Sequence, residues 1–273
     1  MNILVTNDDG ITSPGLLGLA IEMAKLGTVR ILAPDRNWSA SGHVKTLDRP
    51  LRVKEVQLTE QMKGWASDGA PSDCVALAIC GFFDEKIDLV VSGINPYANL
   101  GHDVTYSGTV TAAMEATIFG VPAIAVSVDS PENLVGPVNY QPAANVACQV
   151  AEAVTRYGLT SNTLLNVNVP YLQMEDIKGL QITRMGLRVY HDKLDKRMDP
   201  RNRPYYWTFG EIPTGIPERG TDIGAISDGY VSITPIHLDL TAYQSLPDLN
   251  SWEWSLHRRG KISTVSKKAD HPL

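Results

Sequence analysis

The sequence predicts an α/β protein with a doubly wound, mostly parallel sheet, Rossmann-like and three-layered, and a β-rich C-terminal extension used in oligomerisation. Apolar strand-like runs alternate with helix-like runs through the first half of the chain. Runs such as ILV, DLVV and AIAV are nearly continuous in apolar residues, as strands covered by helices on both faces should be. Strands are predicted over residues 2–6, 29–33, 87–92, 122–127 and 164–169, and helices over residues 14–26, 70–83, 109–119 and 143–157.

The helix boundaries carry their own signals. Ser13 is suited to cap the first helix, Pro14 to its first position, and Gly27 lies just past its end. Gly120 and Gly158 follow the predicted helices that end at residues 119 and 157.

The pattern changes after about residue 175. Segments such as LQITRMGLRVY and RPYYWTFG are β-rich and irregular, which is typical of hairpins or extended arms. We therefore predict a doubly wound core over residues 1–175. Residues 176–273 are predicted to form a β-rich hairpin and C-terminal arm that completes the core and serves oligomerisation. A partner subunit is expected to bury the aromatic side chains of residues 205–207.

Composition narrows the function classes. The chain has 273 residues, 43% hydrophobic and 20% charged, which is ordinary for a globular protein. Its net charge is −6 and no run of Lys and Arg forms a stripe, which argues against binding duplex nucleic acid. No segment approaches the roughly 20 apolar residues of a membrane span, and the chain begins directly in a strand, so we expect a cytoplasmic protein.

Polar residues gather where three predicted strands end. Asp8 and Asp9 follow the first strand, Asn37 and Ser39 follow the second, and Asn95 follows the third. Because ligands of an open parallel sheet bind beyond the carboxyl ends of its strands, these residues should meet at one edge.

The adjacent acids allow two interpretations. Two carboxylates, a hydroxyl and an amide carbonyl are hard oxygen ligands suited to Mg²⁺ or Mn²⁺. A dication would also offset the repulsion between Asp8 and Asp9. However, Asn-Asp-Asp-Gly is good turn composition, so the pair can instead line a turn or cap the next helix.

Ser107, Gly108 and Thr109, at the start of an apolar helix, also allow two interpretations. Ser107 can simply be an N-cap with a flexible neighbour. A helix N-terminus also attracts anions, and glycine lets a phosphate come close, so the stretch can bind phosphate opposite a cation. With Asn37, these residues form the predicted phosphate- and substrate-binding set.

The sequence lacks the motifs of several other classes of nucleotide-binding, hydrolytic and zinc sites. The chain has no GxxxxGK[ST], no GxGxxG after the first strand and no GxSxG. The six histidines show no HExxH or HxH arrangement, and the three cysteines have no zinc spacing. His43 and His102 lie on loops near the candidate site, where a minor role stays open.

Taken together, the motifs resemble those of the stationary-phase survival protein SurE family of metal-dependent nucleotidases. The most specific stretches are ILVTNDDGITSPGL, DLVVSGINPYANLGHDVTYSGTVTAAMEA and GTDIGAISDGYVSITPIHLDLTA. The resemblance implies hydrolysis of nucleoside 5′- or 3′-monophosphates to nucleoside and phosphate. It also implies a homodimer or homotetramer with exchanged C-terminal segments.

The family's site residues carry over onto this chain one by one. The resemblance implies one divalent cation per subunit, Mg²⁺ or Mn²⁺, and places the Ser-Gly-Thr stretch at the phosphate. The implied metal ligands are Asp8, Asp9, Ser39 and Asn95. Asp8 and Asp9 are also the predicted catalytic residues, and the sequence leaves open whether one attacks phosphorus or acts as a base on water.

Two positions depart from the family pattern. Tyr97 stands where relatives commonly have Gly, and a required positive φ there would force the loop onto another path. The loop after the second strand reads Trp38-Ser39-Ala40-Ser41-Gly42, so Ser41 is a conceivable substitute for Ser39. Trp38 could stack on a base or serve only in packing.

Three rival functions can be compared with this interpretation, and two of them lack residues that they require. A receiver domain would need Asp at the third strand end, where this chain has SGIN, and a Lys near AIAVSVDS. A phosphatase of the DxDxT type would need separated acids, whereas Asp8 and Asp9 are adjacent. The remaining alternative is a non-catalytic nucleotide- or phosphate-binding regulator on the same scaffold.

Overall fold

The computed structural model describes residues 1–254, apart from the side chains of residues 191, 192 and 209–213. The chain divides into two compact units, Met1–Leu238 and Asp239–Leu273. Each is described by itself.

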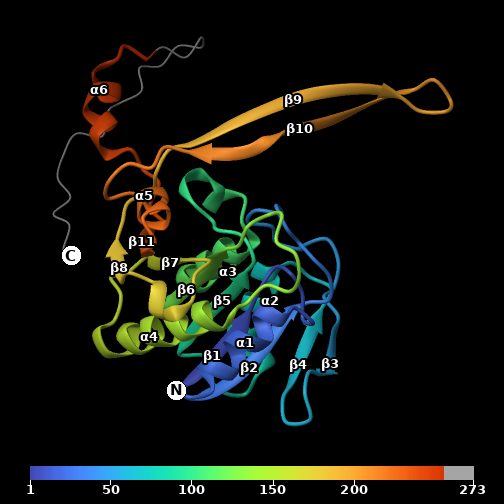
Figure 1. Cartoon of the computed structure of the whole chain (residues 1–273), viewed down its shortest axis with the longest axis vertical. Coiled ribbons are helices and arrows are strands. Elements are labelled where there is room, and N and C mark those ends of the chain that lie inside the picture. Colours follow the sequence, from blue (N-terminus) through green and yellow to red (C-terminus); the bar gives the residue numbers. More distant parts are fainter. Residues whose placement is uncertain (255–273) are drawn as a thin grey trace. The chain divides into compact units, whose positions relative to one another are not determined.

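A nine-stranded sheet forms the centre of the first unit (Figure 1). Its strand order is β3-β4-β2-β1-β5-β6-β7-β11-β8, and β4-β2-β1-β5-β6-β7 are parallel neighbours. The strands are β1 (Asn2–Thr6), β2 (Thr28–Pro34), β3 (Val53–Gln57), β4 (Lys63–Ser67), β5 (Leu89–Asn95), β6 (Ala123–Asp129), β7 (Thr163–Pro170), β8 (Leu180–Ile182) and β11 (Val231–His237). The predicted α/β fold with a mostly parallel sheet is confirmed.

Helices cover both faces of this sheet and produce three layers. α1 and α4 pack together in one buried apolar cluster, and α2 and α3 pack together in another. The longer helices are α1 (Pro14–Met23), α2 (Pro71–Leu77), α3 (Gly108–Ile118), α4 (Gln141–Tyr157) and α5 (Asp222–Ser227). Shorter turns are the π-helix η1 (Ala78–Phe82) and the 3-10 helices η2 (Gly101–Thr105) and η3 (Met174–Asp176).

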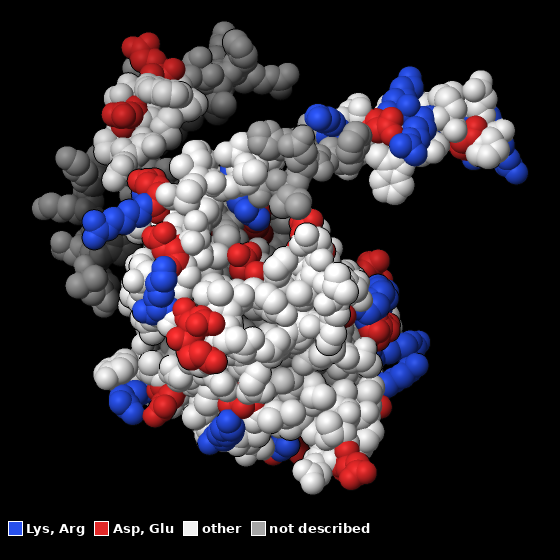
Figure 2. Space-filling model, viewed as in Figure 1, with Lys and Arg blue, Asp and Glu red and all other residues white. Residues whose placement is uncertain are grey.

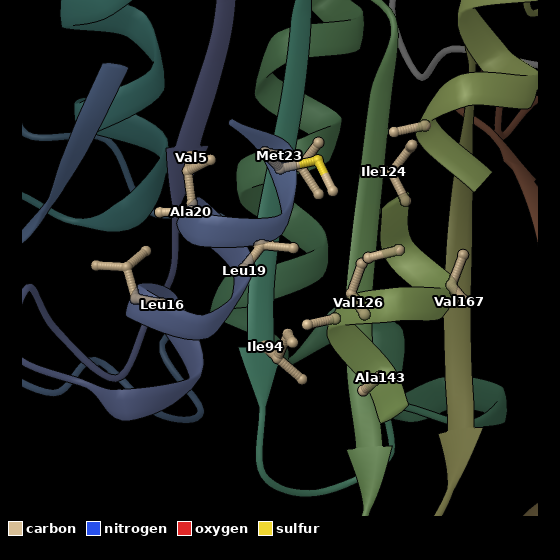
Figure 3. Close-up of a cluster of buried hydrophobic side chains, with 14 of the residues drawn as sticks. Val5, Leu16, Leu19, Ala20, Met23, Ile94, Ile124, Val126, Ala143 and Val167 are labelled. Carbon is tan, nitrogen blue, oxygen red and sulfur yellow. The ribbon is translucent and has the colours of Figure 1, made fainter. Parts of the chain in front are cut away.

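The core beneath α1 holds the central strands in place. Figure 3 shows Leu19 and Met23 of α1 on the side of the helix where Ile94 and Val126 lie, and Leu16 belongs to the same buried cluster. All five side chains are fully buried, and each such burial contributes about 1.5–3 kcal/mol. This packing fixes the ends of β1 and β5, from which the candidate site residues project.

Two differences from the sequence prediction concern the α2 side of the molecule. β3 and β4, which no strand prediction covers, pair antiparallel at the sheet edge. The helix predicted over 70–83 ends as α2 at Leu77 and continues as the π-helix η1, within which Gly81 has a φ of +111°. A left-handed residue interrupts regular helical hydrogen bonding, so the apolar pattern extends further than the α-helix.

The segment after residue 175 supplies two strands of the central sheet. β11 pairs with β7, and β8 pairs with β11, so the first compact unit extends to Leu238, past the boundary predicted at 175. β9 (Arg188–Met198) and β10 (Pro204–Gly215) form a separate antiparallel hairpin (Figure 1). Tyr206 and Trp207 on this hairpin are more than half exposed.

The second unit contains the 3-10 helix η4 (Tyr243–Ser245) and α6 (Leu246–Ser251). It exposes Leu240, Trp252 and Trp254. The predicted oligomerisation and segment exchange of this C-terminal region remain predictions, and residues 255–273 lie outside the described part of the chain.

The described residues form neither a continuous basic surface on the face shown nor a long apolar helix. On the face in Figure 2, the described Lys and Arg side chains are scattered among Asp and Glu and do not merge into a continuous basic surface. No helix within residues 1–254 combines the length and apolar character that crossing a membrane would need.

Candidate active site

The turn after β1 is closed by Asn7 and Gly10. The Asn7 side-chain amide donates to the Gly10 carbonyl, and its oxygen accepts from the Gly10 N–H, both at 3.1 Å. Gly10 has a φ of +103°, which glycine adopts without strain. Because these two residues make the turn, the carboxylates of Asp8 and Asp9 are left for other partners.

The two acids are packed into the carboxyl edge of the sheet. Asp8 is 3% exposed, and its Oδ1 accepts a hydrogen bond from the Thr109 hydroxyl at 2.5 Å. Burial raises the pKa of Asp8 despite that hydrogen bond, which acts in the opposite direction. Burial, and then the neighbouring Asp8 charge, raises the pKa of Asp9 to about 7. The Oδ2 atom of Asp9 is buried and finds no hydrogen-bond partner among the described residues.

The N-terminus of α3 lies directly against Asp8. The Ser107 hydroxyl oxygen accepts from the Val110 N–H at 3.1 Å, so Ser107 is the N-cap of this helix. A Cβ added at Gly108 would lie 2.6 Å from the Asp8 Cβ, a separation that real side chains do not reach. Glycine therefore allows the contact between helix and acid, and brings the positive end of the helix dipole to the site.

The loop after β2 approaches from the other side. The Trp38 N–H donates to the Asp8 carbonyl at 2.8 Å, and the Asn37 Oδ1 accepts from the Ser39 N–H at 2.6 Å. Asn37 therefore shapes the backbone that carries the exposed Ser39. The Arg36 guanidinium lies 4.7 Å from the Trp38 ring centroid, a cation–π contact that gives this ring a packing role.

A buried glutamate on α3 holds the same loop in place. Glu115 accepts from His43 at 2.8 Å and from Lys45 at 2.6 Å, and it is only 3% exposed. Burial opposes ionisation of Glu115, but the bonds from His43 and Lys45 outweigh it and keep its pKa below the ordinary value. The Thr111 hydroxyl adds a bond to the Gly42 carbonyl at 3.0 Å. α3 therefore supports both its own N-terminus and the Ser39 loop.

Asn95 ends β5, which lies beside β1 in the sheet. Its side-chain nitrogen donates to the Tyr97 carbonyl at 2.5 Å, and its Oδ1 accepts no hydrogen bond from the described residues. Tyr97 needs no positive φ, since the non-glycine residues in that conformation within the described chain are Ala40, Asn162 and Asn202. The loop strain considered for Tyr97 is therefore absent.

Tyr140, at the start of α4, is a neighbour of the acids that sequence reasoning missed. Its ring lies 3.0 Å from where a Cβ on Gly15 would stand. Burial, and then the charge of Asp9, raises the pKa of Tyr140 to about 12. Its phenol therefore stays protonated near Asp9. No motif marks this position, because a tyrosine before a helix is common on any surface.

Some residues that the sequence predicts for the site contact Asp8 directly, and others do not. Gly108 and Thr109 contact Asp8, whereas the Asn37–Ser39 loop reaches Asp8 through the backbone of Trp38. The Ser107 hydroxyl is engaged in capping. Within residues 1–254, no three His, Cys, Asp or Glu side chains form a conventional metal centre. A cation at this site would therefore draw on hydroxyl, amide and water oxygens besides the two carboxylates.

Comparison with known proteins places this arrangement in a family. Residues 3–192 match the family model described as survival protein SurE. The chain belongs to the SurE family. The protein named 5′-nucleotidase SurE from Chloroflexus aggregans is 49% identical over 254 residues, covering 93% of this chain and 100% of the relative. Its namesake from Geobacter sulfurreducens is 50% identical over 259 residues, covering 94% and 96%.

A solved SurE structure agrees with the fold as well. The crystal structure of SurE from Aquifex aeolicus superimposes with a TM-score of 0.78 at 41% identity, covering 92% of this chain and 98% of that chain. The resemblance inferred from NDDG, SGIN and YSGTV is therefore confirmed.

The raised pKa of Asp9 predicts how the stability of this SurE-family chain depends on pH. Without divalent cations, Asp9 retains a proton up to about pH 7 when folded, but loses it near its ordinary value of 3.8 when unfolded. The folded state therefore binds more protons across this range. Asp9 should lower the free energy of unfolding as pH rises from about 4 to about 7, by at most ~1.4 kcal/mol per pH unit.

Urea denaturation in chelator at several pH values, on the wild type and Asp9→Asn, isolates this contribution. We expect the variant to gain stability relative to the wild type as pH rises to about 7, and the difference to level off above that. A difference that does not change with pH would contradict the assignment.

Proposed function

We propose that this chain is a divalent-cation-dependent phosphomonoesterase that hydrolyses nucleoside 5′-monophosphates, and also 3′-monophosphates, to nucleoside and phosphate. The observation that carries the proposal is the buried Asp8–Asp9 pair, with one unpartnered carboxylate oxygen, against the N-terminus of α3. The name 5′-nucleotidase SurE of relatives about half identical to this chain supports a nucleotide substrate.

The donor set fits a hard divalent cation. Asp9 offers a buried oxygen without a partner, and Asn95 offers a free amide oxygen. Burial raises the pKa of both acids, and the charge of Asp8 raises the pKa of Asp9 further, so a cation would offset both effects. The proposed ligands are Asp8, Asp9, Ser39 and Asn95. Bound there, Mg²⁺ or Mn²⁺ would supply positive charge against the phosphate oxygens.

The chain's own residues then bind and orient the phosphate. The N-terminus of α3 attracts its negative charge, and the missing side chain at Gly108 lets this end of the helix lie against Asp8. The positive end of α3 would stabilise charge on the equatorial oxygens during transfer, and the Thr109 hydroxyl, which donates to Asp8, would orient that acid. Asp8 or Asp9 would either attack phosphorus or accept a proton from an attacking water.

Phosphate release tests the proposal directly. The protein is stripped of metal with a chelator, dialysed, and assayed with a panel of 5′- and 3′-nucleoside monophosphates, first alone and then with Mg²⁺ or Mn²⁺. We expect release only when a divalent cation is present. No release with either cation, in a protein that still binds the nucleotide by calorimetry, would contradict the proposal and favour a non-catalytic nucleotide-binding regulator.

A further inference from the structure

A second cavity opens at the ends of β5 and β6, and the phosphate chemistry above does not use it. Its volume is about 670 Å³, within the range of small-molecule binding sites. Its lining combines one aromatic ring with several polar groups. The lining includes Tyr97, Asp129, Ser130, Glu132 and Arg188.

The loop after Asn95 leads from the candidate active site to this cavity, where Tyr97 forms part of the lining. The carbonyl of Tyr97 accepts from Asn95, and the carbonyl of Pro96 accepts from the Ser130 hydroxyl at 2.5 Å. β1, β5 and β6 are consecutive neighbours in the sheet. With a strand spacing of about 4.8 Å, β1 and β6 are roughly 10 Å apart across the sheet, and Asp129 lies four residues, or roughly 13 Å, beyond the register position of Thr6. A nucleotide whose phosphate lies beyond the Asp8 side chain can therefore reach the cavity with its nucleoside only in an extended conformation.

The charges in the cavity favour hydrogen-bond donors over anions. Asp129 and Glu132 make no hydrogen bond within the described chain, so their carboxylates are available as acceptors. The guanidinium of Arg188 is already paired with Asp103 at 2.7 Å. The cavity therefore repels a second phosphate and attracts hydroxyl and amino groups.

The cavity also presents an aromatic surface. Tyr97 is 50% exposed, while its backbone is held through the carbonyl bonded to Asn95. A ring on an anchored backbone can stack on a planar base with little loss of conformational freedom. Sugar hydroxyls and a flat base are the two chemical features that a nucleoside offers.

We propose that this cavity binds the nucleoside part of the substrate, with the Asp129 carboxylate accepting hydrogen bonds from the ribose hydroxyls and the Tyr97 ring stacking on the base. The inference rests on the proposed function and names the groups that select its substrate. Ribonucleotides are then preferred over esters that lack either the hydroxyls or the base.

Removing each part of the substrate and each residue in turn tests this assignment. The substrates are adenosine 5′-monophosphate, its 2′,3′-dideoxy form without the hydroxyls, and ribose 5-phosphate without the base. The variants are Asp129→Ala and Tyr97→Leu. Asp84→Ala is the matched control, because Asp84 is exposed and lies before β5, at the opposite edge of the sheet.

The expected results differ between the two variants. Wild type and Asp84→Ala should prefer the ribonucleotide over its dideoxy form by roughly 10-fold or more in kcat/KM, as for hydrogen bonds to a charged acceptor. Asp129→Ala should bring this preference to within about 3-fold. Tyr97→Leu should lower the preference for the ribonucleotide over ribose 5-phosphate by roughly 10-fold and leave the dideoxy ratio unchanged.

Calorimetric titration with adenosine separates the two proposals. Wild-type binding that weakens about 10-fold in Asp129→Ala supports the nucleoside cavity even if no substrate is hydrolysed, in which case only the proposed function fails. Hydrolysis with substrate ratios and adenosine affinity equal in wild type, Asp129→Ala and Tyr97→Leu would overturn the nucleoside cavity and leave the proposed function standing.

Discussion

Replacing Asp8 with Asn should lower kcat/KM for nucleotide hydrolysis by roughly 10³-fold or more, while the protein stays folded. Asn preserves the size of Asp8 and keeps an oxygen to accept the Thr109 hydroxyl bond. It removes the negative charge that, in the proposed function, holds the cation and faces the phosphate. The loss should therefore fall on cation binding and turnover.

Stability should change in the opposite direction. In metal-free protein above pH 7, Asp8 and Asp9 repel each other, and this repulsion contributes to the raised pKa of Asp9. Asp8→Asn should therefore melt at a temperature equal to or above that of the metal-free wild type. Calorimetric Mn²⁺ titration, thermal melting and the phosphate assay check these points, with Asp84→Asn as a charge-matched control. Near-wild-type turnover in Asp8→Asn would exclude the proposed role of this acid.

Gly108→Ala should reduce the activity of the same site through a steric clash. Its new methyl group would lie 2.6 Å from the Asp8 Cβ, so the helix start and the acid must separate. Displacing a catalytic group by about 1 Å can cost roughly 10²-fold in rate, and we expect a loss of that size. Overpacking of this kind should also lower the free energy of unfolding by about 1–3 kcal/mol.

Gly18→Ala is the matched control for this substitution. Gly18 lies inside α1, and the nearest atom to an added Cβ is 3.9 Å away, so the methyl group has room. This variant should keep full activity and gain about 0.5–1 kcal/mol, because alanine favours a helix interior over glycine. Equal activity of the Gly108→Ala and Gly18→Ala variants would show that the close contact with Asp8 is unimportant for turnover.

The central strands were predictable from the sequence because nearly all their side chains are apolar. β5 and β6 are buried on both faces, so they read as apolar runs of the right length. The edge strand β3 was missed because VKEVQ mixes exposed polar residues with few apolar ones, and its neighbour β4 because KGWAS is short and has only two apolar side chains. Edge strands depend on pairing with their neighbour, and that pairing leaves little trace in composition.

The sequence predicts site residues that directly follow a strand. It predicts less well those that are positioned by contacts with residues far away in the sequence. Asp8 and Asn95 are located by the strands that precede them. Glu115 acts through contacts with residues about 70 positions away, so only its isolation within an apolar helix could have indicated a buried ion pair. The sequence shows that residue 97 is a tyrosine where relatives commonly have glycine, but it does not show that Tyr97 avoids a positive φ.

The attachment of the Ser39 loop to Glu115 has a mechanical consequence. Asp8 and Asp9 are fixed to β1, whereas the loop and the start of α3 are joined to one another through the helix. Asp8 is bonded to both of them, through the Thr109 hydroxyl and the Trp38 N–H, so the acid, the loop and the start of α3 form one connected network. A substitution that moves any one of the three should therefore displace the other two, even where it does not touch them.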